Sequence, residues 1–179
     1  MNNLPLSFQS DRLIYTKPQV DDAIEIFNSY SHDPDVTKYT TWKPHKSVKE
    51  TSEFLEMIIK KWEQNLEFNY VIRIKQSKKL IGMIKISANK NGKNIGYVVA
   101  RNQWNKGYAT EATKAVIEML FGFGINIIQS FCDIENKASE KVMKKSGLRR
   151  KKILKKFIIH PNLSLEKRDC LLYEIYKNP

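Results

Sequence analysis

The sequence predicts a single domain of mixed α/β (α+β) class, with a mostly antiparallel, twisted sheet of about seven strands and about four helices. Three observations indicate this class. The chain has 179 residues, a length that one domain accommodates. No internal repeat and no linker rich in glycine, serine or proline divides it, so we expect one domain over residues 1–179. Segments with strand or helix periodicity follow in the order β-α-α-β-β-β-α-β-α-β-β.

The N-terminal third of the chain is expected to hold one strand and two helices. A short strand over residues 12–17 ends at a proline. Two acidic residues then favour a helix N-terminus, and apolar residues at helical spacing extend this helix over about 21–30. Residues 31–46 contain two prolines and are expected to form a loop. A Ser-x-x-Glu capping box then opens a helix over about 47–65.

The middle of the chain predicts an antiparallel meander followed by one parallel crossover. Three strands are separated by short polar turns, of which the second contains an Asn-Gly pair at 91–92. A helix over about 108–121 and a strand over 127–133 come next. Only this β-α-β unit has a helical connection of the kind that joins parallel strands. The three meander strands are expected at 68–75, 80–86 and 94–100.

The C-terminal part predicts a short helix and two further strands. Asn136 is a good N-cap, and Gly147 is a good stop signal for the helix between them. Two strands over about 149–159 and 169–176 flank the loop HPNLSLEKR.

Composition excludes several classes of protein. With 41% hydrophobic and 28% charged residues, the chain is expected to be folded and not embedded in a membrane. It has no apolar stretch of about 18 residues and no secretory signal at its start. Two cysteines cannot build a disulfide framework, and three histidines have no metal-ligand spacing. We therefore expect a cytoplasmic protein without a bound metal or a membrane partner.

The charge is strongly positive but unevenly distributed. The formal net charge is +12, with 25 lysines and only six arginines, whereas nucleic-acid readers rely on arginine. Nucleic acid is therefore an improbable partner, and codon bias is an alternative cause of the lysine excess. Residues 1–67 carry a net charge of −3 and residues 68–179 a net charge of +15. The run Lys144–Lys156 holds eight basic residues and is either a solvated face or a phosphate or RNA contact.

The strongest local signal is a strand, a tight polar turn and a helix N-terminus over residues 95–109. Unpaired backbone N–H groups converge at such a point, where the helix dipole is positive, so the segment predicts an anion site. Gly107 allows the backbone to approach a phosphate closely, and Lys106 adds a cation. Neither GxxxxGK[ST] nor GxGxxG is present, so the site is not one of those phosphate-binding loops.

At this point the chain resembles the GNAT N-acetyltransferase superfamily, in particular its RimJ/RimL branch of ribosomal-protein N-terminal acetyltransferases. Residues 104–109 match the family's Q/R-x-x-G-x-G/A motif, and Asn136 and Ser139 match its NxxS element. The opening R-L-x-x-T-x-P, the WKPHKS loop and the HPNLS…RDxxLY segment are also similar, so the resemblance covers about residues 11–176. Asn105 replaces the usual glycine, which costs little if Asn105 adopts a positive φ. Met143 stands where some members have a tyrosine acid.

The resemblance implies acetyl-CoA as co-substrate, bound by a core over about 94–148. It places the pantetheine arm beside the strand that ends at Ala100, and a backbone N–H, that of Val99, on the thioester oxygen. Asn136 would hold the arm, and Ser139 would approach the sulfur as a second catalytic group. The implied cofactor contacts are Val98, Val99, Ala100, Trp104, Asn105, Lys106, Gly107, Tyr108, Ala109, Thr110, Asn136 and Ser139.

Simpler interpretations of several residues remain open. Asn136 is equally explained as a helix cap, and Ser139 as a helical serine bonded to the main chain. Cys132 fits a buried filler, and Tyr97 a wall residue better than an acid. His160 faces either the acceptor or solvent.

The acceptor side is expected in the helices over about 20–65, with Trp42, His45 and Tyr97 as contacts. This region is acidic, which favours a cationic acceptor.

In the family an amine attacks acetyl-CoA directly. An α-amine near pKa 7.8 is about one-tenth neutral at pH 7, whereas a lysine amine is almost fully charged, and no strong base is evident. The N-terminus of a ribosomal protein is therefore the favoured acceptor. An alternative acceptor is a small-molecule amine (polyamine, antibiotic or metabolite), and an alternative class of protein is a non-catalytic CoA- or RNA-binding module. We expect the protein to be a monomer or a homodimer.

Overall fold

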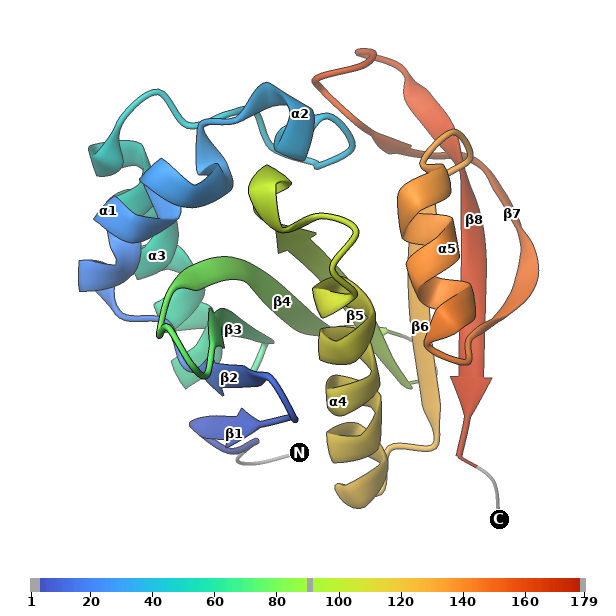
Figure 1. Cartoon of the computed structure of the whole chain (residues 1–179). Helices are drawn as coiled ribbons and strands as arrows, with labels where there is room; N and C mark the ends of the chain where they lie inside the picture. The colour runs from blue at the N-terminus through green and yellow to red at the C-terminus, as the bar shows by residue number, and fades with distance from the viewer. Residues whose placement is uncertain (1–3, 90–91, 178–179) are drawn as a thin grey trace.

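The computed structural model describes residues 4–89 and 92–177, which form a mixed α/β fold around one eight-stranded sheet (Figure 1). The strand order is β1-β2-β3-β4-β5-β6-β8-β7. Neighbouring strands are antiparallel, except for the parallel pair β5 and β6 that the α4 crossover connects. The predicted fold class and the position of the parallel crossover are thus confirmed.

The bounds of the elements differ from the predicted ones mainly near the N-terminus. The strands are β1 Ser7–Gln9, β2 Leu13–Thr16, β3 Glu67–Ile74, β4 Leu80–Asn89, β5 Gly92–Val99, β6 Ile127–Asp133, β7 Arg149–Ile159 and β8 Lys167–Tyr176. The helices are α1 Ala23–Ile26, α2 Pro34–Thr37, α3 Val48–Glu63, α4 Tyr108–Gly122 and α5 Lys137–Lys145. Short non-α turns, Val20–Asp22, Phe27–Ser31 and Arg101–Gln103, flank α1 and follow β5.

Two elements escaped the sequence analysis because both are very short. β1 has three residues and pairs only with β2, and α2 forms a single turn within the predicted loop over 31–46. The helix predicted over 21–30 is divided into three turns of different type. The predicted Asn-Gly turn includes Asn91, which lies outside the described residues.

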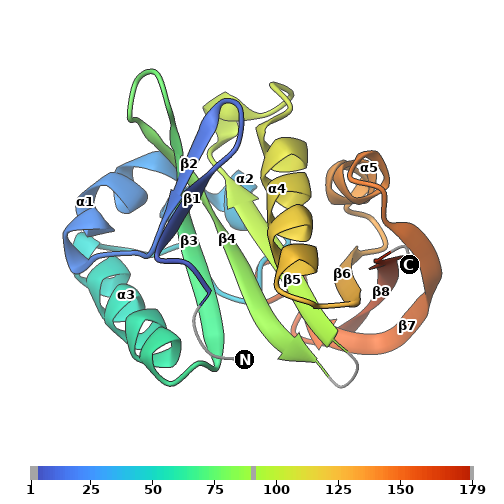
Figure 2. The same ribbon diagram turned by 90° about the horizontal axis from the view of Figure 1, so that it is seen from below.

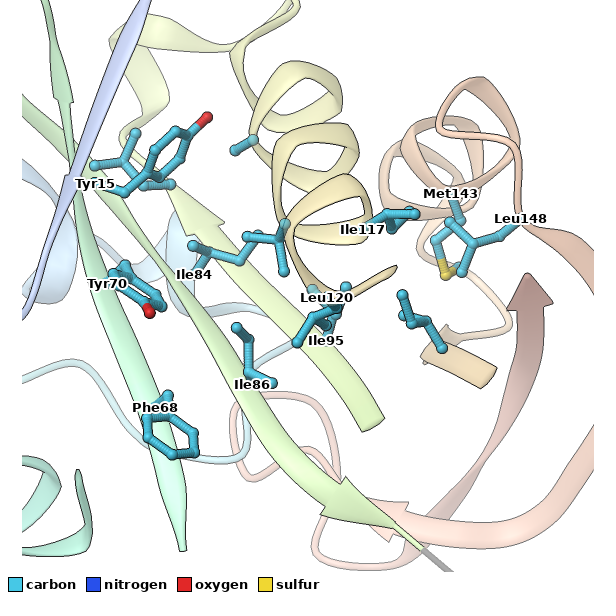
Figure 3. Close-up of a cluster of buried hydrophobic side chains, with 14 of the residues drawn as sticks. Tyr15, Phe68, Tyr70, Ile84, Ile86, Ile95, Ile117, Leu120, Met143 and Leu148 are labelled. Carbon is cyan, nitrogen blue, oxygen red and sulfur yellow. The ribbon is translucent and has the colours of Figure 1, made fainter. Parts of the chain in front are cut away.

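Helices cover both faces of the sheet, and each face has its own hydrophobic cluster. Val71 of β3 packs with α1 and α3, whereas its neighbours Tyr70 and Ile72 enter the cluster on the α4 side. This alternation is the expected two-residue period of a strand buried on both faces. Figure 2 shows α3 and α4 on opposite sides of the central strands. In Figure 3, Ile117 and Leu120 of α4 and Met143 of α5 converge on the sheet cluster.

The parallel strands β5 and β6 diverge soon after they begin. Their pairing is limited to Lys93↔Ile128 and Asn94↔Gln129, although β5 continues to Val99 and β6 to Asp133. The C-terminal halves of both strands therefore separate, and α4 and α5 begin just beyond their ends (Figure 1). This divergence positions the candidate site.

Candidate functional site

The N-terminus of α4 presents a group of unpaired amides, which we call the α4 cradle. Asn105 and Gly107 adopt positive φ angles of 62° and 82°, so the chain curls tightly before the helix begins. The expectation that Asn105 tolerates this conformation is confirmed. In the described part of the chain, the amides of residues 105–110 have no main-chain acceptor. Together with the positive end of the helix dipole, they can bind an anion.

A second segment of the chain supports the α4 cradle from outside. Glu111, in the first turn of α4, accepts hydrogen bonds from the Ser10 hydroxyl (2.7 Å), the Arg12 backbone amide (2.8 Å) and Arg12 Nε (2.7 Å). Burial alone would raise the pKa of Glu111, but these donors hold it below its ordinary value. Arg12 Nη1 also donates to the carbonyl of Lys106 at 3.1 Å. Sequence reasoning missed this contact between the N-terminal strands and the cradle.

The edge of β5 that faces β6 carries the second feature. The Ala100 N–H donates to the carbonyl of Ile81 in β4 at 2.7 Å, so the amide of Ala100 points toward β4. Main-chain N–H and C=O groups alternate in direction along a strand, so those of Val99 point away from β4, toward the gap where β5 and β6 diverge. The Val99 carbonyl accepts the indole N–H of Trp104 at 2.7 Å. Because β6 pairs with β5 only at Lys93 and Asn94, the Val99 amide has no acceptor among the described residues. The same side of β5 is also held at Ile95, whose carbonyl accepts from the Ser130 hydroxyl at 2.8 Å.

The first turn of α5 forms the opposite wall. The side chain of Asn136 caps the helix by accepting from the amide of Ser139 at 3.1 Å. The hydroxyl of Tyr97 on β5 donates to the Ser139 carbonyl at 3.3 Å and thereby bridges the diverging strands. Burial raises the pKa of Tyr97 above its usual range. Met143 is fully buried in the core, so it packs rather than faces the site.

A buried carboxylate holds the turn from which α5 starts. Asp133, fully buried at the end of β6, accepts from Arg168 Nε at 2.5 Å and from the amide of Glu135 at 2.9 Å. Burial would raise the pKa of Asp133, but Arg168 and this amide keep it low. The Nε2 atom of His160 is buried and makes no hydrogen bond in the described ranges. It lies 3.8 Å from the carboxylate of Asp133. The ionised carboxylate of Asp133 therefore holds the β6–α5 turn in place.

The predicted acceptor residues Trp42 and His45 lie in a separate wall, formed by the loop 38–47. The centres of their rings are 5.1 Å apart. His45 Nδ1 shares a hydrogen bond with the hydroxyl of Thr51 in α3 at 2.8 Å. Burial lowers the pKa of His45. The β7–β8 loop ties this wall down: Asn162 donates to the carbonyls of Thr37 (2.7 Å) and Trp42 (2.8 Å). We call this contact the Asn162 clasp.

The acidic residues expected around the acceptor are partly used within the chain. Asp35 pairs with Arg101 at 2.7 Å, and Glu53 pairs with Lys49 at 3.9 Å on the surface of α3. Glu50 closes the N-terminus of α3 by accepting from the amide of Lys46, while its own amide donates to Ser47 Oγ at 3.2 Å. The excess negative charge of this region is therefore smaller than composition indicates.

The structure brings most of the sequence-predicted site residues into one place. Residues 98–100 at the end of β5 lead through the turn Arg101–Gln103 into residues 104–110 of the α4 cradle. Tyr97 connects this stretch with Ser139 and its cap. Trp42 and His45 share no hydrogen bond or ion pair with this group in the described residues. Sequence reasoning overlooked Arg12, Glu111, Asp133 and Asn162. The available signals were the R-L opening for Arg12, the glutamate after GYAT for Glu111 and the HPNLS segment for Asn162.

These features fit an elongated anionic cofactor. An unpaired strand edge can pair with amide groups of an extended arm, and the amide cradle at its end can bind phosphate oxygens. A metal role has no comparable support, because the described residues contain no cluster of three potential metal ligands. None of the helices in the described ranges has the length and apolarity needed to span a bilayer.

The diverging parallel strands and the α4 cradle thus define a fold and a candidate site that fit an extended, phosphate-bearing cofactor. Residues 12–149 match the family model of the acetyltransferase (GNAT) domain, so the chain belongs to the GNAT acetyltransferase family. It is an acetyl-CoA-dependent N-acetyltransferase. Over 152 residues it is 28% identical to the N-acetyltransferase p20 of Bacillus licheniformis, covering 83% of this chain and 85% of that protein.

Solved structures agree with this assignment. A GNAT-family acetyltransferase from Bacillus anthracis has a TM-score of 0.82 at 28% identity, covering 95% of this chain and 98% of that chain. RimL, a ribosomal α-N-protein acetyltransferase in complex with coenzyme A, has a TM-score of 0.82 at 16% identity, covering 96% of each chain. At that identity, the second likeness shows the fold alone.

Proposed function

We propose that this chain acetylates the α-amine of a protein N-terminus, with the α4 cradle binding the diphosphate of acetyl-CoA. The divergence of β5 and β6 carries this proposal. It leaves the Val99 amide unpaired at the end of a strand edge, directly before the amide cradle. Residues 94–148 then form the cofactor core, and the segments between 20 and 65 form the acceptor side.

The chain's own groups have defined tasks in this scheme. Acetyl-CoA supplies the acetyl thioester. The Val99 amide donates to the thioester oxygen, where negative charge develops as the amine attacks. The neutral amine attacks, the C–N bond forms and the C–S bond breaks, and Ser139 donates a hydrogen bond to the leaving sulfur. The proton that the nitrogen loses passes to the thiolate through Ser139 or water, so the products are the amide and free CoA thiol. The side chain of Asn136 contacts the pantetheine arm in addition to capping α5. Trp42, His45 and Tyr97 form the walls that receive the acceptor.

The carboxylates next to the site favour an acceptor that is already partly neutral. Ion pairing and hydrogen bonds keep the pKa of Asp133 low, although burial opposes them, and the hydrogen bond from Lys144 lowers the pKa of Glu140 to about 2. Groups with such pKa values accept protons poorly. An α-amine needs little help at neutral pH, whereas a lysine amine needs a strong base. We therefore place the acceptor with the N-terminal acetyltransferases that typify the RimJ/RimL branch, rather than with the small-molecule enzymes that the branch also includes.

The test compares acceptors that offer an α-amine, only lysine amines, or only polyamine nitrogens. Acetyl-CoA turnover is measured as released thiol with a basic peptide that has a free N-terminus, with the same peptide acetylated at its N-terminus, and with spermidine. We expect turnover with the free N-terminus only. Turnover of the blocked peptide, through its lysines, or of spermidine alone would contradict the α-amine assignment and favour a small-molecule or lysine acceptor.

A further inference from the structure

The guanidinium of Arg12 covers the outer side of the α4 cradle, although Arg12 lies 94 residues before Lys106 in the sequence. Arg12 follows the turn between β1 and β2. The antiparallel pairing of β2 with β3 sets the place of this turn in the sheet. The position of the arginine therefore depends on the fold and not on the local motif.

Three contacts hold the guanidinium in one orientation. Nε pairs with Glu111 at 2.7 Å, Nη1 donates to the Lys106 carbonyl at 3.1 Å, and Cζ lies 4.6 Å from the centre of the Tyr108 ring. Glu111 also accepts the backbone amide of Arg12, so backbone and side chain share one anchor. An arginine fixed in this way loses little further conformational entropy when it binds a ligand.

One nitrogen of Arg12, Nη2, has no partner among the described residues. Nη2 makes no hydrogen bond or ion pair in residues 4–89 and 92–177, and the Arg12 side chain is 50% exposed. A Cβ atom on Gly107 would lie 3.4 Å from Nη2, so this nitrogen lies directly beside Gly107 in the cradle. Nη2 carries two N–H donors, and guanidinium groups suit phosphate oxygens.

We propose that Arg12 is a binding residue for the diphosphate of acetyl-CoA, through Nη2, and that Glu111 is the positioning residue that aims it. The inference rests on the proposed placement of the diphosphate in the α4 cradle. An exposed ion pair by itself contributes little to stability. The same pair placed beside an anion site supplies a preorganised charge, which adds more to ligand affinity than to folding.

The test measures binding directly by calorimetry, without turnover. The ligands are CoA, 3′-dephospho-CoA and pantetheine, and the proteins are the wild type, Arg12→Ala, Glu111→Gln and the double variant. We expect Arg12→Ala to weaken CoA and dephospho-CoA by the same factor, about tenfold or more, and to leave pantetheine unchanged, because pantetheine has no diphosphate. Glu111→Gln should weaken CoA less, and it should add nothing in the Arg12→Ala background.

Matched controls separate this role from general effects. Lys60→Ala removes one exposed positive charge from α3 and should change CoA affinity by less than about twofold. An equal loss for all three ligands, with a lower Tm, would show that Arg12 is only a structural contact. A loss for CoA but not for dephospho-CoA would move Arg12 to the 3′-phosphate and overturn the assignment.

The Gly107→Asp variant distinguishes failure of this inference from failure of the proposed function. If Gly107→Asp abolishes CoA binding and Arg12→Ala leaves it unchanged, the cradle stands and the role of Arg12 is refuted. If both variants bind CoA like the wild type, the diphosphate does not lie in the cradle, and both proposals fail.

Discussion

The proposed cofactor side and the proposed acceptor side of this enzyme are built in different ways. On the cofactor side, the groups that face the divergence of β5 and β6 are mainly main-chain amides from the contiguous stretch 95–110. On the acceptor side, the loop 38–47 is fixed by side chains from far along the chain, above all by Asn162 in the β7–β8 loop. Main-chain groups suit a constant ligand, whereas a loop held by side-chain contacts can vary with the acceptor.

The largest expected effect of a side chain on the proposed cofactor side is at the first turn of α5. Ser139→Ala removes the hydroxyl proposed to assist the leaving sulfur, and we expect kcat to fall about a hundredfold at saturating acetyl-CoA. The KM for acetyl-CoA and the Tm should change little, because the helix cap uses the Ser139 amide and not its hydroxyl. A kcat within twofold of the wild type would remove Ser139 from the chemistry.

The Asn162 clasp should affect the acceptor side alone. Asn162→Ala removes one donor from the carbonyls of Thr37 and Trp42, which then keep only their local hydrogen bonds from Thr40, so the loop 38–47 loses its tie to the β7–β8 loop and becomes less well positioned. We expect the acceptor KM to rise about tenfold, while the calorimetric affinity for acetyl-CoA stays within twofold. Asn126→Ala, at an exposed position before β6, is the matched control. Equal losses for both substrates would mean that the two sides are not separable.

Asn136 has two possible roles, and two substitutions separate them. Asn136→Ala loses the cap on α5 and should lower the free energy of unfolding by about 1 kcal/mol. Asn136→Ser retains a capping oxygen but lacks the amide, so it should fold like the wild type and bind acetyl-CoA about fivefold more weakly. Wild-type affinity of the serine variant would leave Asn136 as a cap only.

The smallest effect concerns the Arg12–Glu111 pair in the protein without cofactor. The folded-state pKa of Glu111 lies below its ordinary value of 4.5, so its stabilising contribution is present above pH 4.5 and is lost as the pH falls through the folded pKa. Glu111→Gln should therefore destabilise the protein near pH 7 by at most about 1 kcal/mol, with the difference vanishing at lower pH. Urea unfolding at several pH values measures this, with Glu118→Gln as an exposed control on the same helix. A difference that grows toward acid pH would contradict the assignment.

The contrast between the two sides also explains how much the sequence could predict. Strand, turn and helix follow directly around Gly107, so local spacing was sufficient to locate the cradle and the parallel crossover. Arg12 and Asn162 act through contacts made 94 and 120 residues away along the chain, and no local pattern encodes such distances. β1 was missed because three residues carry too little periodicity.

Contacts between distant segments changed two further expectations. Asp133 was known only as the end of a strand, and its role became visible when β8 placed Arg168 beside it. The acidic character of the acceptor region was overestimated because composition does not reveal pairs such as Asp35 with Arg101. Both cases depend on which strands and loops become neighbours, a property of the topology.

The most direct test of the cofactor site is calorimetric titration of acetyl-CoA into the wild type, Gly107→Asp, Gly107→Ala and Gly122→Asp. Gly107 has a φ of 82° at the cradle, whereas a Cβ atom on Gly122 would meet nothing within 4 Å. We predict roughly micromolar binding by the wild type and Gly122→Asp, a moderate loss from backbone strain in Gly107→Ala, and no measurable binding by Gly107→Asp. Wild-type affinity of the Gly107→Asp variant would contradict the placement of the diphosphate at the N-terminus of α4.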